Sequence, residues 1–243
     1  MFLIEVFKQR PRKHVAFCFG RMNPPTIGHA RLMNATARAS MGGDYWIFLS
    51  HTQDSKKNPL DYNTKVDFVK AVFPQHDDHV SVGTGLRTIM DIMEFLYHHN
   101  YTDVTYVCGN DRLPAFEKLL NEYNGKEGSK TYYKFNSIDV VSSGPRDPDE
   151  EDAVAAVSAS GARAAAEQGD FETFKQITGA GRYAKQLYRA VRQGMNILDE
   201  NAAGVGVVAT NKKMARDPRY STSMTADVRP DTPQKNLKAF KLA

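Results

Sequence analysis

The sequence predicts an α/β fold, a doubly wound, Rossmann-like parallel sheet followed by C-terminal helices and an irregular basic tail. Over residues 14–141, short apolar runs alternate with longer segments of helical period. This alternation is typical of a parallel sheet with right-handed crossovers. Most of the runs are almost continuously apolar, as expected for strands that helices cover on both faces. We assign residues 1–200 to one domain and residues 201–243 to the tail.

Five apolar runs are predicted as strands. They are "HVAFCFG" at 14–20, "YWIFLS" at 45–50, "HVSVG" at 79–83, "VTYVCG" at 104–109 and "FNSIDVV" at 135–141. Cys18 and Cys108 fall inside two of these runs, where a thiol usually behaves as a small core hydrophobe. Trp46 also lies in a predicted strand, so we expect it in the core.

Helices are predicted between and after these strands. The first group comprises a helix that begins near His29 and helices at 63–73, 88–100 and 114–125. Pro74 follows the helix at 63–73, while Pro114 begins and Asn124-Gly125 ends the helix at 114–125. Proline and Asn-Gly are typical of helix boundaries. An acidic loop at 142–152 precedes a second group of three predicted helices. The first is capped by Ser158 and ended by Gly169, and the second is short. The third carries Tyr183, Leu187 and Val191 at a spacing of four.

Composition indicates a globular protein without a membrane segment. Hydrophobic residues make up 41% of the 243 residues and charged residues 25%, which is ordinary for a folded domain. No apolar run approaches the roughly 18 residues that a spanning helix needs. The apolar part of the N-terminus is short and its basic cluster follows it, so we expect no secretory signal and a cytoplasmic location.

The positive charge of the chain is concentrated in the tail. Residues 201–243 contain eight Lys or Arg, three Asp and no Glu, a net charge of +5, whereas the whole chain carries +4. The body is therefore not an evident nucleic-acid binder. We expect the tail to be mobile or to bind a polyanion or an acidic protein partner. A spacer without a partner and an arm that packs across a neighbouring subunit of a homo-oligomer are the alternatives.

The stretch "FGRMNPPTIGHARLM" at 19–33 predicts an anion site after the first strand. Gly20 allows the backbone to turn close to a ligand, and Gly28 removes a side chain at the start of the following helix. The free amides of that helix, together with its dipole, attract phosphate. Thr26 and His29 add side-chain donors. The stretch lacks the spacing of a P-loop or of GxGxxG; the alternative is a rigid strand-to-helix corner with a capping histidine.

Three segments resemble signatures of the HxGH-type nucleotidyltransferase superfamily, whose members include cytidylyltransferase-like and nicotinamide-mononucleotide (NMN) adenylyltransferase-like proteins. "GRMNPPTIGH" is similar to the first signature, with Thr26 where most members have the first His. "SASGAR", from Ser158 to Arg163, is similar to the second signature. "CGNDR" at 108–112 resembles the Gly-Ser-Asp-Arg loop that holds the adenosine side, with Asn110 in place of Ser. The resemblance covers residues 14–200.

The resemblance implies a reaction and a set of site residues. A phosphate monoester would attack the α-phosphorus of a nucleoside triphosphate, ATP in the first instance, and expel pyrophosphate; Mg²⁺ would be carried by the nucleotide and not by protein ligands. Thr26, His29 and Arg163 would be catalytic. The nucleotide-binding residues would be Gly20, Arg21, Met22, Asn23, Gly28, Gly109, Asn110, Asp111, Arg112, Ser158, Ala159 and Ser160.

The acceptor is predicted from two further features. Asn58-Pro59-Leu60 resembles the Asn-Pro-Phe segment of archaeal-type NMN adenylyltransferases, which implies that Asn58 contacts an NMN-like acceptor. Arg87 follows the third predicted strand and either pairs with an acceptor phosphate or is a solvated loop residue. Thr26 also fits the pattern of phosphopantetheine adenylyltransferases, so a pantetheine phosphate or a sugar phosphate remains an alternative acceptor.

Other interpretations stay open. The same arrangement resembles nucleotidyltransferase-like proteins of large tailed bacteriophages, for which no acceptor is implied and the location would be the host cytoplasm. A non-catalytic nucleotide-binding or virion-assembly protein could retain the fold and use the basic tail for docking. His76, His79, His98 and His99 do not form a metal set by position, so we predict no metal site.

Because every predicted site segment precedes residue 164, truncation after Glu200 should leave nucleotidyl transfer within about threefold of the full chain. Few apolar residues of the tail could offset the entropy of ordering it. Pyrophosphate release by the full and truncated proteins measures this. A truncated protein that melts markedly lower, together with a tail that resists proteolysis, would show that the domain boundary is wrong.

Overall fold

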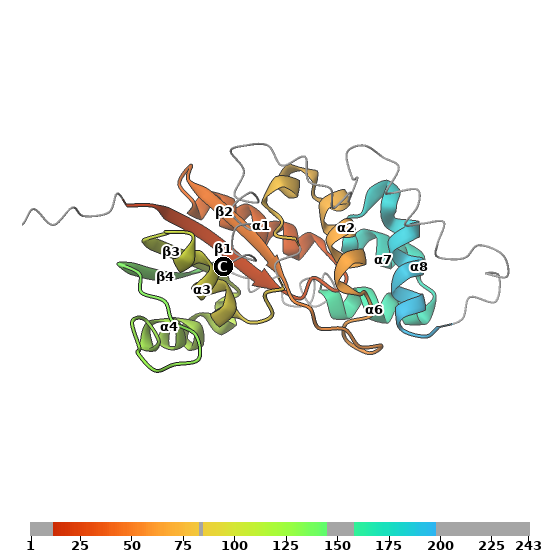
Figure 1. Ribbon diagram of the computed structural model, residues 1–243. Coiled ribbons are helices and arrows are strands. Elements are labelled where there is room, and N and C mark those ends of the chain that lie inside the picture. The colour runs from red at the N-terminus through yellow and green to blue at the C-terminus, as the bar shows by residue number, and fades with distance from the viewer. Residues whose placement is uncertain (1–11, 83–84, 145–157, 198–243) are drawn as a thin grey trace, which may run out of the picture.

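The computed structural model describes residues 12–82, 85–144 and 158–197 and contains a four-stranded parallel sheet (Figure 1). Its strands are β1 (His14–Gly20), β2 (Asp44–Leu49), β3 (Asp103–Cys108) and β4 (Ser137–Ser142), in the order β2-β1-β3-β4. Every neighbouring pair is parallel. The predicted α/β, doubly wound fold class is confirmed. Four of the five predicted strands are confirmed: β1 has the predicted bounds, and the ends of β2, β3 and β4 are shifted by one or two residues.

The predicted strand at 79–83 is wrong over residues 79–82, and residue 83 lies outside the described residues. Residues Pro74–His79 form a 3-10 helix, η1, and only an isolated parallel bridge between Val80 and Ile47 follows it. The Ser81 N–H donates to the Ile47 carbonyl at 2.9 Å. η1 occupies the chain up to His79, whose ring stacks on Tyr45 and whose Nδ1–H donates to the Tyr45 carbonyl at 3.1 Å. Over residues 79–82, the alternating apolar residues therefore form a single bridge and no strand.

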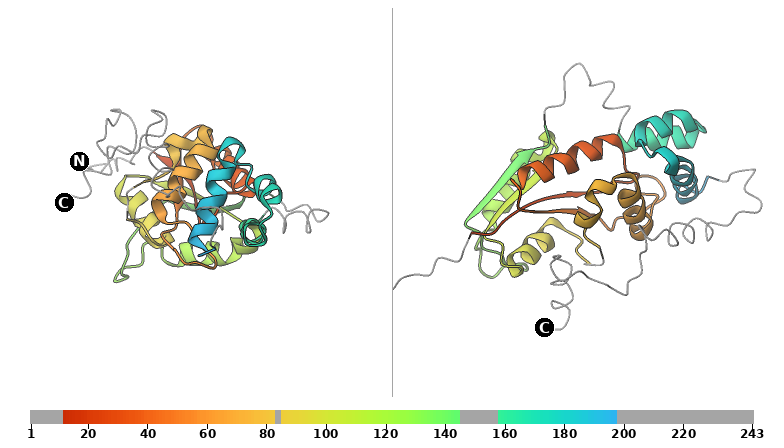
Figure 2. Two further views of the ribbon diagram at one scale, coloured as in Figure 1. Left: turned by 90° about the vertical axis from the view of Figure 1, so that its right-hand side faces the viewer. Right: turned by 90° about the horizontal axis from the view of Figure 1, so that it is seen from above.

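Helices cover both faces of the sheet, and side chains alternate between them along each strand. Cys18 of β1 packs in the core shared with α1 (Ile27–Ala39) and α2 (Tyr62–Val72). Its neighbour Phe17 packs in the core shared with α3 (Ile89–His98) and α4 (Leu113–Glu122). Figure 2 shows α1 and α3 on opposite sides of the sheet. The predicted core positions of Cys18, Cys108 and Trp46 are confirmed.

Three further helices form a third core beyond the carboxyl end of the sheet (Figure 1). They are α6 (Ala159–Gln168), α7 (Phe171–Thr178) and α8 (Ala184–Gly194). The predicted stripe of Tyr183, Leu187 and Val191 packs in this core. Gly169 ends α6 with a φ of 82°, in the left-handed region that glycine adopts without strain, as its position predicted. The tail, 201–243, lies outside the described residues.

Two glycines let the C-terminal helices approach the rest of the domain. A Cβ atom on Gly194, at the end of α8, would lie 2.1 Å from the Pro59 carbonyl oxygen. A Cβ atom on Gly179, between α7 and α8, would lie 2.8 Å from Ile27 Cγ1 at the start of α1, and Gly179 has a φ of 60°. These contacts fix α6–α8 against the loop that follows β1 and the turn that follows β2.

We expect Gly194→Ala to destabilise the protein by about 1–3 kcal/mol, the usual cost of forcing an extra carbon into a packed contact. The Pro59 backbone cannot rotate away as a side-chain end could. Urea unfolding followed by circular dichroism measures the free energy of unfolding. Gln193→Ala, at the exposed neighbouring position of α8, is the control and should change it little. Equal stability of the two variants would contradict the close packing.

Candidate functional site

The loop that follows β1 leaves the sheet at its topological switch point. From β1 the chain runs to β2 on one side and later crosses to β3 on the other side. In open α/β sheets, ligands bind in the crevice outside the carboxyl ends of the strands at this point. The β1–α1 loop, residues 21–26, occupies that position, as the sequence predicted for its anion site.

Asn23 holds this loop to the turn after β2. Its Nδ2 donates to the Leu60 carbonyl at 2.8 Å, and its Oδ1 accepts from the Leu60 N–H at 3.0 Å. The side chain is 1% exposed. Met22, beside it, has a φ of 43° and a fully buried side chain. The side chains of these two predicted nucleotide-binding residues are therefore buried and hold the loop in place from inside.

Thr26 and His29 form a unit at the start of α1. His29 Nδ1 accepts the Thr26 backbone N–H at 3.0 Å, and Thr26 Oγ1 lies 3.0 Å from the same nitrogen. A ring nitrogen that accepts carries no hydrogen, so the hydrogen of the neutral ring is on Nε2. Burial, followed by the positive charge of Arg21, lowers the pKa of His29 to about 4. At neutral pH, His29 is thus an uncharged donor through Nε2, oriented by Thr26.

The N-terminus of α6 brings a second anion-binding element to the same place. Ser158 Oγ accepts the Gly161 N–H at 3.0 Å and lies 2.7 Å from Ser160 Oγ. Arg163 extends from the first turns of this helix and its Nη1 donates to the Asn23 carbonyl at 2.7 Å. The two predicted signatures, 140 residues apart, therefore meet at one residue of the β1–α1 loop.

Positive charge dominates this meeting point. Burial and the neighbouring Arg21 lower the pKa of Arg163, and the carboxylate of Asp54 opposes this effect. Hydrogen bonds, first from the Lys57 N–H and then from the Asn58 side chain, lower the pKa of Asp54 to about 2. Two arginines and the N-termini of α1 and α6 converge here, which is the charge distribution that binds phosphate groups.

The remaining predicted residues lie around this centre. Asn110, Asp111 and Arg112 are exposed in the 3-10 helix η2 (Asn110–Arg112), directly after β3 at the same edge of the sheet. Gly109 precedes them, and a Cβ atom there would lie 2.7 Å from Asp111 Oδ1. The predicted adenosine loop is therefore on the neighbouring strand end, where a nucleotide bound over β1 would reach it.

The two predicted acceptor-binding residues differ in accessibility. Arg87 is exposed. Asn58 is 3% exposed, and its Nδ2 donates to Asp54 Oδ2 at 2.5 Å. Asp54 and Asn58 also exchange backbone hydrogen bonds of 2.9 and 3.2 Å. The Asn58 side chain thus closes the turn after β2, and a contact with the acceptor stays a prediction.

The structure also shows groups that sequence reasoning missed. Lys65 of α2 is fully buried and its Nζ donates to the carbonyl of Ser50, the residue after β2. His51 stacks on Tyr62, with ring centroids 3.9 Å apart. Lys65 lies on the apolar stripe of α2, three and four residues before Phe68 and Val69, and a lysine in such a stripe is the signal that was available. His51 directly follows a strand end, a position typical of ligand contacts.

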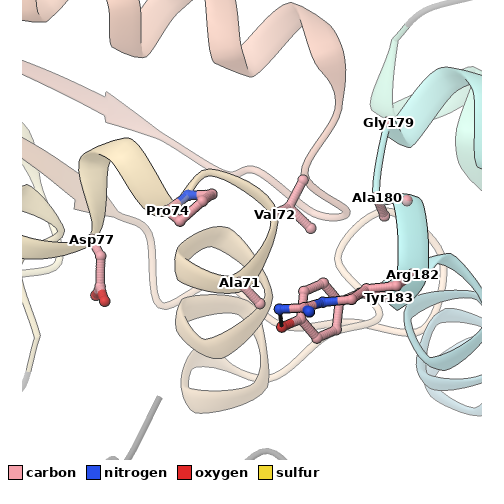
Figure 3. A pocket seen from close by; sticks show the side chains of 9 residues that line it. Ala71, Val72, Pro74, Asp77, Gly179, Ala180, Arg182 and Tyr183 are labelled. Atoms are coloured by element: carbon pink, nitrogen blue, oxygen red, sulfur yellow. Dashed lines mark hydrogen bonds between the residues drawn. The ribbon is translucent and has the colours of Figure 1, made fainter. Parts of the chain in front are cut away.

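A cleft lies elsewhere, between α2 and the α7–α8 junction (Figure 3). Its lining residues are Ala71, Val72, Pro74, Asp77, Gly179, Ala180, Gly181, Arg182 and Tyr183. None of the predicted site residues lines it. Arg182 is held against Tyr183, with 2.7 Å between its Nη2 and the phenol oxygen. We therefore place the candidate site at the carboxyl end of β1 and not in this cleft.

Comparisons with known proteins add little to this geometry. No protein-family model matches the sequence, and the search of curated proteins gave no match. Among solved structures, the chain is similar to a bifunctional NMN adenylyltransferase/ADP ribose pyrophosphatase from Francisella tularensis, with 12% identity and a TM-score of 0.45 over 73% of this chain and 52% of that chain. The chain thus spans about half the length of that structure. A likeness of this size carries no argument about activity.

Within the part of the chain that the structure describes, no group of three or more His, Cys, Asp or Glu side chains is placed to hold a metal ion. In the same part, no helix has the length and apolar character needed to cross a membrane.

Histidine protonation should make the protein less stable as the pH falls from about 6.5 toward 4. The folded state lowers the pKa of His29 to about 4, chiefly by burial, while the unfolded chain protonates near pH 6.5. The unfolded state therefore binds more protons in this window. His29→Gln should remove about 2 kcal/mol of this pH dependence, given about 1.4 kcal/mol per pKa unit.

The comparison with the parent isolates His29 from other groups. Burial also lowers the pKa values of His51, His76 and His79, whereas it raises that of Asp67 to about 6 and so acts in the opposite direction. Urea unfolding at pH 7.0 and 4.5 gives the two free energies for each protein. His98→Gln, at an exposed position, is the control. An identical pH dependence in His29→Gln and the parent would contradict the burial of a neutral ring.

Proposed function

We propose that the protein is a nucleotidyltransferase that transfers a nucleoside monophosphate, AMP from ATP in the first instance, to a phosphate monoester with release of pyrophosphate. The observation that carries the proposal is the hydrogen bond of 2.7 Å between Arg163 Nη1 and the Asn23 carbonyl. It holds Arg163 of α6 against the loop that carries Arg21 and leads into α1, at the switch point of the sheet. A triphosphate bound there would meet the N-termini of both helices.

The reaction needs positioning and charge stabilisation more than a protein nucleophile. An oxygen of the acceptor phosphate forms a bond to the α-phosphorus, and the bond from that phosphorus to the β-bridging oxygen breaks. Pyrophosphate leaves with the bonding electron pair. His29 Nε2–H donates to the α-phosphate oxygens as charge develops, without giving up its proton. Thr26 keeps the ring in the required tautomer.

Arg163 and the N-terminus of α6 hold the leaving pyrophosphate in this proposal. A guanidinium has five N–H donors, so Arg163 can keep its bond to Asn23 and still donate to the β- and γ-phosphates. Ser158 and Ser160 supply hydroxyls beside the free amides of the same helix turn. Mg²⁺ enters with the triphosphate and neutralises part of its charge. We assign it no protein ligand.

The acceptor is the least constrained part of the proposal. NMN is our first candidate, on the resemblance of the segment around Asn58, and a pantetheine phosphate or a sugar phosphate is the alternative. The direct test incubates the full chain with each labelled nucleoside triphosphate and a panel of phosphate monoesters, and measures pyrophosphate. Release that depends on one acceptor supports the proposal. If the protein binds nucleotide but releases pyrophosphate with none of the acceptors, the transferase proposal is refuted. A non-catalytic nucleotide-binding role would then be favoured.

His29→Ala should lower the turnover number by about 10²–10³-fold, the loss typical of one donor to a developing charge. The fold should persist, because α1 is held to the sheet by Met33, Ala35 and Thr36, which are buried independently of this ring. Steady-state pyrophosphate release and a thermal melt test both parts. His98→Ala is the matched control on an exposed helix end. Unchanged turnover in His29→Ala would refute the role of this residue.

Arg163→Ala should weaken nucleoside triphosphate binding by about 10–100-fold, the value of a charge-assisted hydrogen bond. Acceptor affinity should change much less, because Arg163 is assigned to the β- and γ-phosphates. Titration calorimetry measures both affinities. Arg189→Ala, at an exposed position of α8, is the control for loss of one positive charge. Equal triphosphate affinity in Arg163→Ala and the parent would refute the assignment.

A further inference from the structure

Basic side chains form a stripe along α8 and the turn that leads into it. Residues 181–194 contain four basic residues and no acidic one. The first lies in the 3-10 helix η4 (Gly181–Tyr183), which runs directly into α8. Spacings of three, four and three residues place all four on one side of a helix with 3.6 residues per turn. These residues, which we call the α8 stripe, are Arg182, Lys185, Arg189 and Arg192.

The α8 stripe faces away from the core. The other side of α8 carries Leu187 and Val191, which are fully buried among α6 and α7. Arg182, Lys185 and Arg189 are exposed. No ion pair between described residues includes any of these three. The net charge of the chain gives no sign of this concentration, because the tail carries +5 and the whole chain +4.

An arginine lies on a tyrosine ring at each end of the α8 stripe. The Arg182 guanidinium lies over the Tyr183 ring, 4.8 Å from its centroid, and Figure 3 shows the two side chains together. The Arg192 guanidinium lies over the Tyr188 ring at 5.6 Å, and its Nη1 donates to the Ala166 carbonyl at 2.6 Å. Both tyrosines pack against the core of α6–α8. The rings therefore support two planar guanidinium groups.

The length of the α8 stripe suits a nucleic-acid strand. The stripe spans ten residues, which is about 15 Å at 1.5 Å per residue. One strand of a nucleic acid carries a phosphate about every 3.4 Å of its axis, so about four phosphates can face the four cations. Unstacked bases of a single strand also stack on guanidinium planes. A strand could therefore contact the stripe through its phosphates and through a base at either end.

Other polyanions fit this surface less well. A helix that binds a membrane surface carries large apolar side chains beside its basic ones. In the described ranges, the exposed large hydrophobic residues are Ile27 and Met41, and neither lies on α8. An acidic polypeptide supplies negative charge but leaves the two guanidinium planes without a stacking partner. In a duplex, the bases are already stacked on one another and only the phosphates are available.

We propose that the α8 stripe binds the backbone of a single-stranded nucleic acid, with a base stacked on Arg182 or Arg192. This interaction surface goes beyond the proposed function and does not depend on it, because none of its residues is assigned to the nucleotide or to the acceptor. Binding is independent of base sequence, since phosphate contacts and stacking read no base edges.

The experiment measures binding of the full chain to a fluorescein-labelled oligouridylate of about 20 nucleotides by fluorescence anisotropy. The salt concentration is varied between about 50 and 200 mM. Lys185→Gln/Arg189→Gln should weaken binding about tenfold or more at the lowest salt. It should also reduce the slope of log affinity against log salt by about 1.4, since each lost phosphate contact of a single strand contributes about 0.7. A parent protein that does not bind the RNA overturns the proposal.

Lys118→Gln/Lys134→Gln is the matched control. It removes the same charge at exposed positions of α4 and of the segment after it, at the end of the molecule far from α8 (Figure 1). This control should keep the affinity of the parent within about twofold. The tail is present in every protein, so its own attraction cancels in the comparison. An equal loss of affinity in the two double variants indicates a general charge effect and overturns the proposal.

Arg182→Lys tests the assignment to a single strand. It keeps the charge and removes the plane, so it should weaken binding of the oligouridylate severalfold and leave binding of an RNA duplex of the same length unchanged. An equal effect on both, or no effect on either, overturns the assignment.

Two other polyanions test the class of partner. They are polyglutamate of the same charge and phosphatidylserine vesicles, measured with the parent and with Lys185→Gln/Arg189→Gln. We expect the double variant to lose more affinity for the RNA than for either of them. A greater loss for polyglutamate or for the vesicles would assign the surface to an acidic protein or to a membrane and overturn the proposal.

Discussion

The side chain of Asn23 is the constraint on which the rest of the site depends. The side-chain amide forms hydrogen bonds with the Leu60 carbonyl at 2.8 Å and the Leu60 N–H at 3.0 Å. The backbone carbonyl of Asn23 accepts a hydrogen bond from Arg163 Nη1. One residue thus joins the loop after β1, the turn after β2 and the N-terminus of α6. These segments are far apart in the sequence, so their meeting depends on tertiary contacts. Loss of the amide would leave two backbone groups of Leu60 unpaired in the interior, which costs about 1–3 kcal/mol each.

Close backbone packing and electrostatics act together at this point. Gly194 and Gly179 let α8 and the α7–α8 junction touch Pro59 and Ile27, and this contact supports the position of α6. Arg21, Arg163 and the positive ends of α1 and α6 are then held near one another. Burial lowers the pKa of Arg163 first, and the like charge of Arg21 lowers it further. An anion bound between the two arginines would relieve this repulsion.

The sequence allowed the fold and the outline of the site to be predicted, because both follow from local signals. Continuous apolar runs identified β1–β4, and Gly169 identified a helix end through its backbone freedom. The prediction of a strand at 79–83 was wrong because Val80 and Val82 alternate with polar residues as in a strand. In the structure, η1 extends to His79 and only Val80 then pairs with β2. The fold also uses the side chains of Asn23 and Asn58 to close turns, a role that the sequence did not predict. Such roles depend on partners that are distant in sequence.

The surroundings of Lys65 could not be predicted from the sequence for the same reason, because they depend on partners that are distant in sequence. A lysine in the apolar stripe of α2 is visible in the sequence, but its target, the Ser50 carbonyl, is defined only once β2 and α2 are packed. The unpaired hydroxyls of Ser50 and Ser81 are likewise properties of the packed state. Local patterns therefore predict which segments carry chemistry, and packing decides which side chains face a ligand.

The most direct test of the account is a crystal structure of the full chain with a non-transferable ATP analogue and Mg²⁺. The account predicts the triphosphate at the carboxyl end of β1, with His29 Nε2 within hydrogen-bond distance of an α-phosphate oxygen and Arg163 on the β- or γ-phosphate. Asn23 should keep both bonds to Leu60. A nucleotide bound in the cleft of Figure 3, or at any place away from His29 and Arg163, would contradict it.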